Sequence, residues 1–175
     1  RAKNPSTEEP NYALNWKGTD SIPVLRVASF AISDDVEAKF RFASGLDSIF
    51  TVLQSKNSQS LILDLRGNPG GLSEMGAVLG LYLSEKQFVY AKKLLLTSDS
   101  FPSYMTLDVP GPFAGFPLGI QQKNEIYYWP YHPVRASFQP SNNHFKGKLY
   151  VLTDGNCTST CSEVTSIIYE NCEST

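Results

Sequence analysis

Two consecutive glycines, Gly70 and Gly71, have the clearest chemical meaning in this sequence. They end the stretch Asp64–Gly71, which reads DLRGNPGG and follows the apolar residues 61–63. Glycine adopts positive φ and leaves its backbone amide open to a ligand, because no Cβ stands in the way. A helix that begins after such a turn adds unpaired N–H donors and a positive dipole end. The turn therefore predicts a place that binds developing negative charge, that is, an oxyanion hole.

A candidate nucleophile, Ser159, lies in a second turn of the same kind. It follows the strand-like residues 148–152 and precedes a segment with the pattern of a helix. The dipole of that helix favours the negative charge that grows on a serine oxygen during attack. If the two turns are neighbours, Ser159 can lie beside the amides of Gly70 and Gly71, which places a nucleophile and an oxyanion hole at one reacting carbonyl group, as acyl transfer requires. Taken alone, each turn has an ordinary explanation, as a helix cap or a plain glycine turn.

The polar residues around these turns suggest supporting roles. Asp64 and Arg66 point to the same side of a strand, so we expect an ion pair that braces the turn rather than a direct part in the chemistry. A serine nucleophile also needs a base. His132 and His144 lie in an irregular region, where either could act as the base only if that region folds over Ser159. We expect both to be surface loop histidines instead. Glu163, one helical turn after Ser159, is expected to be a cap or surface residue.

Hydrophobic periodicity predicts the elements that position the turns. The expected strands cover residues 22–27, 60–65, 88–95 and 148–152, and the expected helices cover about 35–55, 72–83 and 160–171. The alternation of strands and helices indicates an α/β fold with a mainly parallel sheet and right-handed crossovers. The nearly continuous apolar segment 60–65 is typical of a central strand buried on both faces.

Two segments depart from this pattern. Residues 1–20 are polar and contain two prolines, so we expect an arm or linker before a domain at 21–175. Residues 97–147 hold seven of the eleven prolines and many aromatic residues without periodicity. Such a length is unusual for a plain connection, so we expect an irregular insertion, with a short strand at 125–129.

Composition limits the function classes. The chain has 175 residues, 41% of them apolar, and a net charge of −2, which suits one globular domain and gives no general attraction to nucleic acid. Apolar runs are too short to span a bilayer, so no membrane insertion is expected. Three cysteines without a CxxC pair make a zinc site improbable, and we expect no metal and no cofactor.

The pairing of the cysteines stays open. Cys161 and Cys172 would lie about 16 Å apart on one helix, beyond the reach of a disulfide. Cys157 and Cys161 are closer and can bridge the turn at Ser159 if the backbone bends there. A free buried thiol is the default expectation for Cys161.

Residues 21 to 167 resemble the catalytic domain of the C-terminal-processing (tail-specific) serine peptidases. The resemblance rests on the D-L-R-x-N-x-G-G element at Asp64–Gly71 and on the strand that leads to Ser159. The CTSTC sequence around that serine is similar to the divergent branch that includes the chlamydial secreted protease. The resemblance implies a crotonase-like (Clp-protease-like) fold of stacked β-β-α units. It also implies a serine endopeptidase with a polypeptide substrate and an acyl-enzyme on Ser159, and an oxyanion held by amides of Gly70 or Gly71 and of Thr160.

The same resemblance raises the question of the base. In the main branch of the family, a lysine downstream of the serine serves, and its position lies beyond Thr175; in the divergent branch, an upstream histidine serves with a downstream glutamate. We therefore expect part of a longer protein with further domains, poorly active alone, in an extracytoplasmic (periplasmic or secreted) location. A non-catalytic ligand- or peptide-binding module on the same fold is the alternative. An acyl-CoA enzyme ranks last, because no basic CoA-binding cluster is visible.

Overall fold

The computed structural model describes residues 11–19, 21–96, 121–129 and 135–171. The chain forms two compact units, Arg1–Phe88 with Phe138–Thr175, and Val89–Ser137. The first unit carries both predicted turns.

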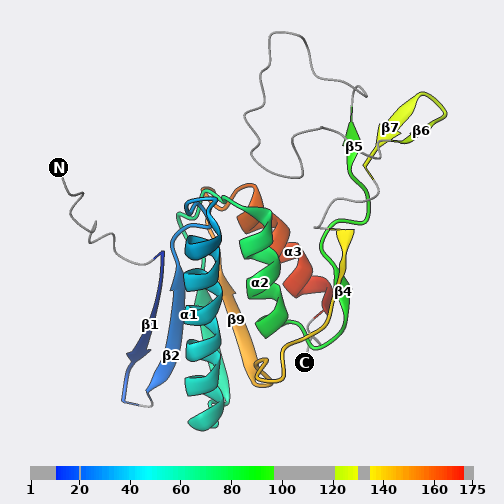
Figure 1. Ribbon diagram of the computed structural model, residues 1–175. Coiled ribbons are helices and arrows are strands. Elements are labelled where there is room, and N and C mark those ends of the chain that lie inside the picture. Colours follow the sequence, from blue (N-terminus) through cyan, green and yellow to red (C-terminus); the bar gives the residue numbers. More distant parts are fainter. Residues whose placement is uncertain (1–10, 20, 97–120, 130–134, 172–175) are drawn as a thin grey trace. The chain divides into compact units, whose positions relative to one another are not determined.

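A four-stranded sheet forms the centre of the first unit (Figure 1). Its order is β1-β2-β3-β9, where the strands are β1 (Tyr12–Lys17), β2 (Ile22–Val27), β3 (Ser60–Asp64) and β9 (Lys148–Leu152). β2, β3 and β9 run parallel, and only β1 is antiparallel to its neighbour. The prediction of an α/β fold with a mainly parallel sheet is confirmed, with β3 between two parallel strands.

Three helices complete this unit: α1 (Val36–Ser55), α2 (Ser73–Leu83) and α3 (Thr160–Asn171). In Figure 1, α1 lies in front of the sheet, and α2 lies between α1 and α3. α1 begins where the sequence predicts, because the Asp35 carboxylate accepts a hydrogen bond from the Ala38 amide at 2.7 Å, as an N-cap does. No helix in the described part of the chain is long and apolar enough to cross a membrane.

The core lies on one face of the sheet. Leu25 of β2 and Leu63 of β3 are fully buried, together with the helix residues Leu46, Phe50 and Leu79, and Phe42 is nearly so. On the opposite face Ile62 is half-buried and its neighbour Tyr150 is 46% exposed. The expectation that β3 is buried on both faces is therefore met on one face only.

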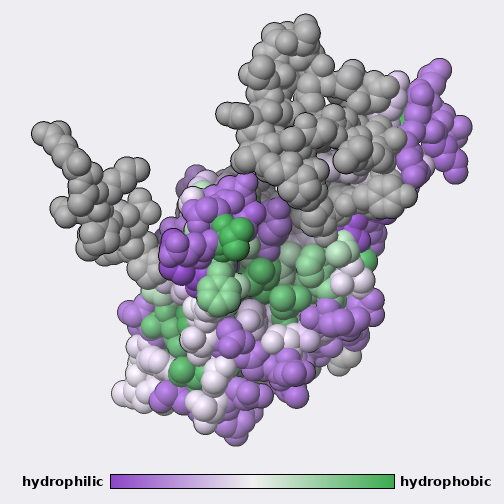
Figure 2. Space-filling view, viewed as in Figure 1, coloured by the Kyte–Doolittle hydropathy of each residue, from purple (hydrophilic) through white to green (hydrophobic). Residues whose placement is uncertain are grey.

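Apolar side chains also reach the outer surface of the helices. On the face shown in Figure 2, they gather over α1 and α2 among polar ones. Val36 and Phe40 near the start of α1 are 84% and 70% exposed, although their spacing agrees with the apolar face of the helix.

β1 corrects part of the expectation of an arm over residues 1–20, of which residues 1–10 and 20 lie outside the described residues. Tyr12–Lys17 pairs with β2 along its full length. The Tyr12 ring packs edge-on against Phe42 with centroids 5.2 Å apart, and the Lys56 ammonium lies 5.1 Å from the centre of the Trp16 ring. Tyr12, Leu14 and Trp16 alternate with Ala13, Asn15 and Lys17, which is the pattern of a half-buried strand.

The remaining strands are short. β4 (Phe88–Val89) and β8 (Ser137–Phe138) form a two-stranded sheet in which the Phe88 and Phe138 rings stack at 5.4 Å. In the second unit, β5 (Leu95–Leu96), β7 (Ile126–Tyr128) and β6 (Gln121–Lys123) form an antiparallel sheet in the order β5-β7-β6. The single strand expected at 88–95 is thus replaced by β4 and β5, and the strand expected at 125–129 is β7.

The C-terminal part of the expected insertion returns to the first unit. The Ser141 amide donates to the Leu81 carbonyl at 2.7 Å, and the Phe145 amide donates to the Tyr82 carbonyl at 2.8 Å. Phe145 is buried there. Residues 97–120 and 130–134 of the insertion lie outside the described residues.

Candidate active site

The two predicted turns lie side by side because their strands are parallel neighbours. Asp64 at the end of β3 is in register with Leu152 at the end of β9. The Leu65 amide continues this ladder and donates to the Leu152 carbonyl at 2.9 Å. Parallel strands end at the same edge of a sheet, so the chain enters both turns there.

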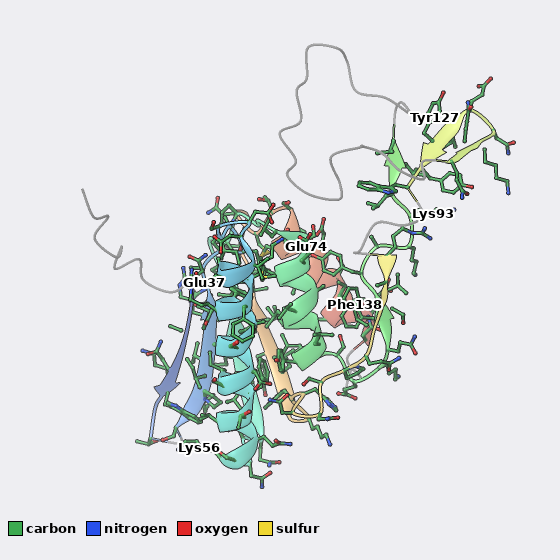
Figure 3. The ribbon with its side chains drawn as sticks, in the orientation of Figure 1. Glu37, Lys56, Glu74, Lys93, Tyr127 and Phe138 are labelled. Carbon is green, nitrogen blue, oxygen red and sulfur yellow. A yellow bond between two sulfur atoms is a disulfide. The ribbon has the colours of Figure 1, made fainter. Side chains whose placement is uncertain are left out.

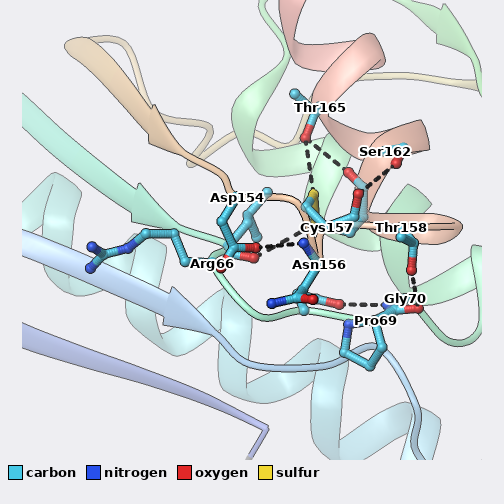
Figure 4. Close-up of a disulfide and its surroundings, with 12 residues drawn as sticks. Arg66, Pro69, Gly70, Asp154, Asn156, Cys157, Thr158, Ser162 and Thr165 are labelled. Carbon is cyan, nitrogen blue, oxygen red and sulfur yellow. Dashed lines mark hydrogen bonds between the residues drawn. A yellow bond between two sulfur atoms is a disulfide. The ribbon is translucent and has the colours of Figure 1, made fainter.

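Hydrogen bonds join the two turns. Thr158 donates from its hydroxyl to the Pro69 carbonyl at 3.1 Å, as Figure 4 shows. The Thr160 hydroxyl donates to the Gly71 carbonyl at 2.8 Å, and Thr160 is fully buried. Each turn therefore fixes the position of the other.

Gly70 is the point of closest approach. Its φ is +94°, and a Cβ added to it would lie 2.7 Å from the Ser159 Cβ and 3.0 Å from the Thr160 amide nitrogen. Glycine is required here both by its backbone conformation and by the space available. The structure thus brings together Ser159, Gly70 and Thr160, three of the predicted site residues.

Ser159 has an unusual backbone. Its φ is +52°, in the left-handed region, and the residue is exposed immediately before the first residue of α3. For a residue other than glycine, such a conformation costs about 1–3 kcal/mol and persists only where the surroundings impose it. Among the described residues, the Ser159 hydroxyl has no hydrogen-bond partner. The turn therefore presents a free hydroxyl on a constrained backbone.

The glycine amides differ in their availability. The Gly70 amide donates to the Asn68 side-chain oxygen at 2.8 Å, and Asn68, which is fully buried, donates in turn to the Val27 carbonyl at 3.0 Å. No acceptor within the described residues takes the amides of Gly71 or Thr160. In this geometry Gly71 and Thr160 are the donors that remain for an oxyanion, while an oxyanion role for Gly70 stays a prediction. Sequence reasoning did not single out Asn68, although its place in the NPGG turn was the available signal.

The predicted ion pair between Asp64 and Arg66 is present. The Arg66 guanidinium donates to both carboxylate oxygens, Nε to Oδ1 at 2.9 Å and Nη2 to Oδ2 at 2.8 Å, and Arg26 lies 3.5 Å away on Oδ2. Asp64 is buried, with 7% of its surface exposed. The hydrogen bonds from Arg66 lower the pKa of the Asp64 carboxyl, so this residue stays ionised as the partner of two arginines.

Asp154 is a second carboxylate that ties the turns together. Its Oδ1 accepts hydrogen bonds from the amides of Gly67 and Asn156, each at 3.0 Å. The hydrogen bond from the Gly67 amide contributes most to lowering the pKa of Asp154, and the bond from the Asn156 amide lowers it further. The residue was not among the predicted site residues, and its position two residues after β9 was the only signal.

A disulfide joins Cys157 and Cys161 across the serine turn (Figure 4). Their Cα atoms are 5.3 Å apart, within the usual range for a disulfide. The expectation of a free thiol at Cys161 is wrong, because the left-handed backbone at Ser159 bends the chain enough to bring the two cysteines together. Cys161 is fully buried and Cys157 is partly exposed.

Glu163 contacts the serine turn from α3. Its amide donates to the Ser159 carbonyl at 3.1 Å, and its carboxylate accepts a hydrogen bond from the Ser73 hydroxyl at the start of α2, at 3.2 Å. Figure 3 labels Glu74, the next residue of α2, at the same end of the unit as Glu37, and Lys56 at the opposite end. The first turns of the helices therefore supply acidic groups on the side of the serine.

His144 lies at the other end of the sheet. It precedes β9, whereas Ser159 follows it, and the five residues of β9 span about 13 Å. The His144 ring nitrogen Nδ1 contacts the Ser141 carbonyl at 2.7 Å. This agrees with the expected loop histidine, and His132 lies outside the described residues. We assign no base among the residues that the structure describes.

Most of the chain matches the sequence pattern of one protein family. Residues 21–172 match the profile of Peptidase family S41. The chain belongs to this family. Membership agrees with the resemblance drawn from the DLRGNPGG motif.

Solved structures similar to this S41 chain have low sequence identity. A candidate peptidase from Parabacteroides merdae aligns with a TM-score of 0.58 at 15% identity, over 92% of this chain and 40% of its own. A candidate S41 protease from Bacteroides fragilis gives 0.52 at 14% identity, over 91% and 36%. The photosystem II D1 C-terminal processing protease gives 0.49 at 20% identity, over 85% and 28%. No curated protein matches the chain significantly. The S41 chain spans two fifths or less of the length of these structures.

Two surface hollows of the S41 chain lie away from the serine. These open hollows have volumes of about 260 and 610 Å³ and lie near the end of α1 and the start of β3, and both are lined by Asn57, Ser58 and Gln59. Ser159 and the glycine turn are not among the lining residues of either hollow.

Proposed function

We propose that this chain is the catalytic core of a serine endopeptidase that processes polypeptide C-termini on a crotonase-like fold. One observation carries the proposal: a serine with φ of +52° lies against Gly70 and the Thr160 amide, at the edge where β3 and β9 end. This is the arrangement that acyl transfer needs, with a nucleophile beside amides that can bind an oxyanion.

The reaction begins with attack of Ser159 Oγ on the scissile carbonyl carbon while the base takes the hydroxyl proton. The carbonyl oxygen gains negative charge, which the Gly71 and Thr160 amides bind by hydrogen bonds. The positive end of the α3 dipole stabilises the same charge. Collapse of this intermediate releases the peptide amine with a proton from the base and leaves an ester on Ser159. Water then hydrolyses the ester, with the base accepting its proton.

The other residues of the site act by positioning. Asn68 and the Asp64–Arg66 pair hold the glycine turn, and Asp154 links that turn to the serine turn. The base comes from outside the described residues, either from His132 or from the remainder of a longer protein. Since the chain covers at most 40% of the three structures named above, we expect that further domains complete the activity.

We also propose an extracytoplasmic location. The disulfide supports it, because such bonds persist mainly in oxidising compartments. Fractionation of the native source with a thiol-trapping reagent tests this: recovery of the protein from the cytosolic fraction with Cys157 and Cys161 as thiols would contradict it.

Labelling of the full-length protein with a fluorophosphonate probe tests the function. The probe should modify Ser159, and Ser159→Ala should abolish both labelling and peptide hydrolysis. Ser166→Ala is the matched control, because Ser166 lies on the exposed side of α3 and bonds only to the Ser162 carbonyl. Folded protein without any labelling would refute the peptidase and favour a peptide-binding module on the same fold.

A further inference from the structure

The two cysteines of the disulfide flank the candidate nucleophile at equal spacing in the chain. Cys157 and Cys161 each lie two residues from Ser159, and the bond joins the loop before α3 to the first turn of that helix. The chain between the two sulfurs is the segment that carries the left-handed backbone of Ser159. Closing a ring around a strained residue limits the conformations to which it can relax.

The other contacts of the serine turn do not hold Ser159 itself in its left-handed conformation. Thr158 and Thr160 bond to the glycine turn on either side of Ser159. The Ser162 hydroxyl donates to the Cys157 carbonyl at 2.9 Å. These bonds hold the residues beside the serine, but none involves an atom of Ser159 itself. Within the described part of the chain, the one bond of the Ser159 backbone is that from the Glu163 amide to its carbonyl, which a relaxed helix start would also make.

We propose that the Cys157–Cys161 disulfide is a positioning element that holds Ser159 in its reactive conformation, and that reduction by a dithiol reversibly lowers the activity. This inference rests on the proposed function. It adds that the site requires an oxidised environment and loses most of its activity in a reducing one.

Reduction of the disulfide by a dithiol proceeds by two thiol–disulfide exchange steps. One thiolate of the reductant attacks the Cys157 sulfur, which is the partly exposed one, and the bond to the Cys161 sulfur breaks. The Cys161 thiolate leaves in the first turn of α3, where the helix dipole stabilises it until it takes a proton. The second thiol of the reductant then attacks the mixed disulfide. The products are two cysteine thiols and one oxidised dithiol, with two electrons and two protons transferred.

The expected effect follows from the strain at Ser159. Without the bond, the residue relaxes towards ordinary backbone angles and the hydroxyl leaves its place beside Gly70. Relaxation releases the backbone strain of Ser159, so roughly one tenth to one hundredth of the molecules keep the serine in its reactive conformation. We therefore expect kcat to fall by roughly ten- to a hundred-fold with little change in KM.

Peptide hydrolysis and hydrogen exchange of the full-length protein, oxidised and after treatment with dithiothreitol, test the proposal together. Reduction should lower kcat and accelerate amide exchange at residues 157–162, and reoxidation should restore both. The double variant Cys157→Ser with Cys161→Ser should behave as reduced protein under all conditions. Cys172→Ser is the matched control and should keep the full redox response. Circular dichroism establishes that each variant is folded.

The outcomes separate the two ideas. Equal exchange at residues 157–162 and equal kcat in both redox states would overturn the positioning role. Faster exchange after reduction, in a protein that hydrolyses no peptide in either state, would support the positioning of Ser159 and refute the peptidase. A kcat that falls after reduction in the double variant as well would show that the effect arises elsewhere and would overturn the proposal.

Discussion

Replacement of Gly70 by alanine is the sharpest test of the close contact between the two turns. The new Cβ would lie 2.7 Å from the Ser159 Cβ, whereas ordinary contacts begin at 3.4 Å. The turns must therefore separate by the difference, about 0.7 Å, because the other close atoms are the backbone of Thr158 and Thr160. We expect Gly70→Ala to fold but to move the serine away from the oxyanion donors.

The magnitude has two parts. The φ of +94° disfavours alanine by about 1–2 kcal/mol. Overpacking of a well-packed contact adds about 1–3 kcal/mol, so the free energy of unfolding should fall by about 2–5 kcal/mol. A displacement of this size at a catalytic group costs about 10- to 100-fold in rate. Urea unfolding measures the first effect, and the rate of fluorophosphonate labelling of Ser159 measures the second.

Two other glycines provide controls for Gly70→Ala. Gly67 also has a positive φ, +74°, but no atom lies within 4 Å of the position that an alanine methyl group would take. Gly67→Ala should cost about 1 kcal/mol from backbone strain alone and should label at nearly the wild-type rate. Gly155 has neither a positive φ nor a close neighbour, so Gly155→Ala should be close to neutral. Equal stability and equal labelling of the Gly70→Ala and Gly67→Ala variants would refute the close contact.

Three further substitutions test the surroundings of the site. Asp64→Asn should lower the free energy of unfolding at pH 7 by roughly 1–2 kcal/mol, since it removes the charge that Arg66 binds. Because folding lowers the pKa of Asp64, the extra stability of the wild type over Asp64→Asn is present above the unfolded pKa and is lost as the pH falls through the folded pKa. The difference in their free energies of unfolding, measured in urea, should therefore be smaller at pH 3 than at pH 7. Thr160→Val removes the hydroxyl that donates to the Gly71 carbonyl and should cost about 1–2 kcal/mol and slow labelling of Ser159; an unchanged labelling rate would argue against coupling of the two turns. Tyr82→Phe removes a hydrogen bond to Asp47 and should cost about 1 kcal/mol near pH 8. Burial and the neighbouring Asp47 raise the pKa of Tyr82 to about 12. The stability that depends on the neutral tyrosine is therefore present below the unfolded pKa and declines as the pH rises towards 12. Unfolding measured between pH 8 and pH 11 should show this decline in the wild type but not in Tyr82→Phe.

Local patterns in the sequence were sufficient for most elements around the site. The helices α1, α2 and α3 lie within a residue or so of their predicted bounds, because capping by Asp35 and apolar periodicity act over neighbouring residues. The order of these elements also determines that β2, β3 and β9 run parallel. The strand β1 was missed, because its stability depends on pairing with β2 rather than on its own composition.

The sequence by itself determined that a glycine turn and a serine turn exist, and the parallel order of their strands made it reasonable to expect them at one edge. Only the tertiary structure decided how they meet. The contact of Gly70 with Ser159 joins residues far apart in the chain, and the disulfide between Cys157 and Cys161 depends on the bent backbone of Ser159. The same holds for His144, which the sequence leaves open as a base and which β9 places at the far end of the sheet. Residue types and periodicity carry local information, whereas these features follow from packing across the sheet.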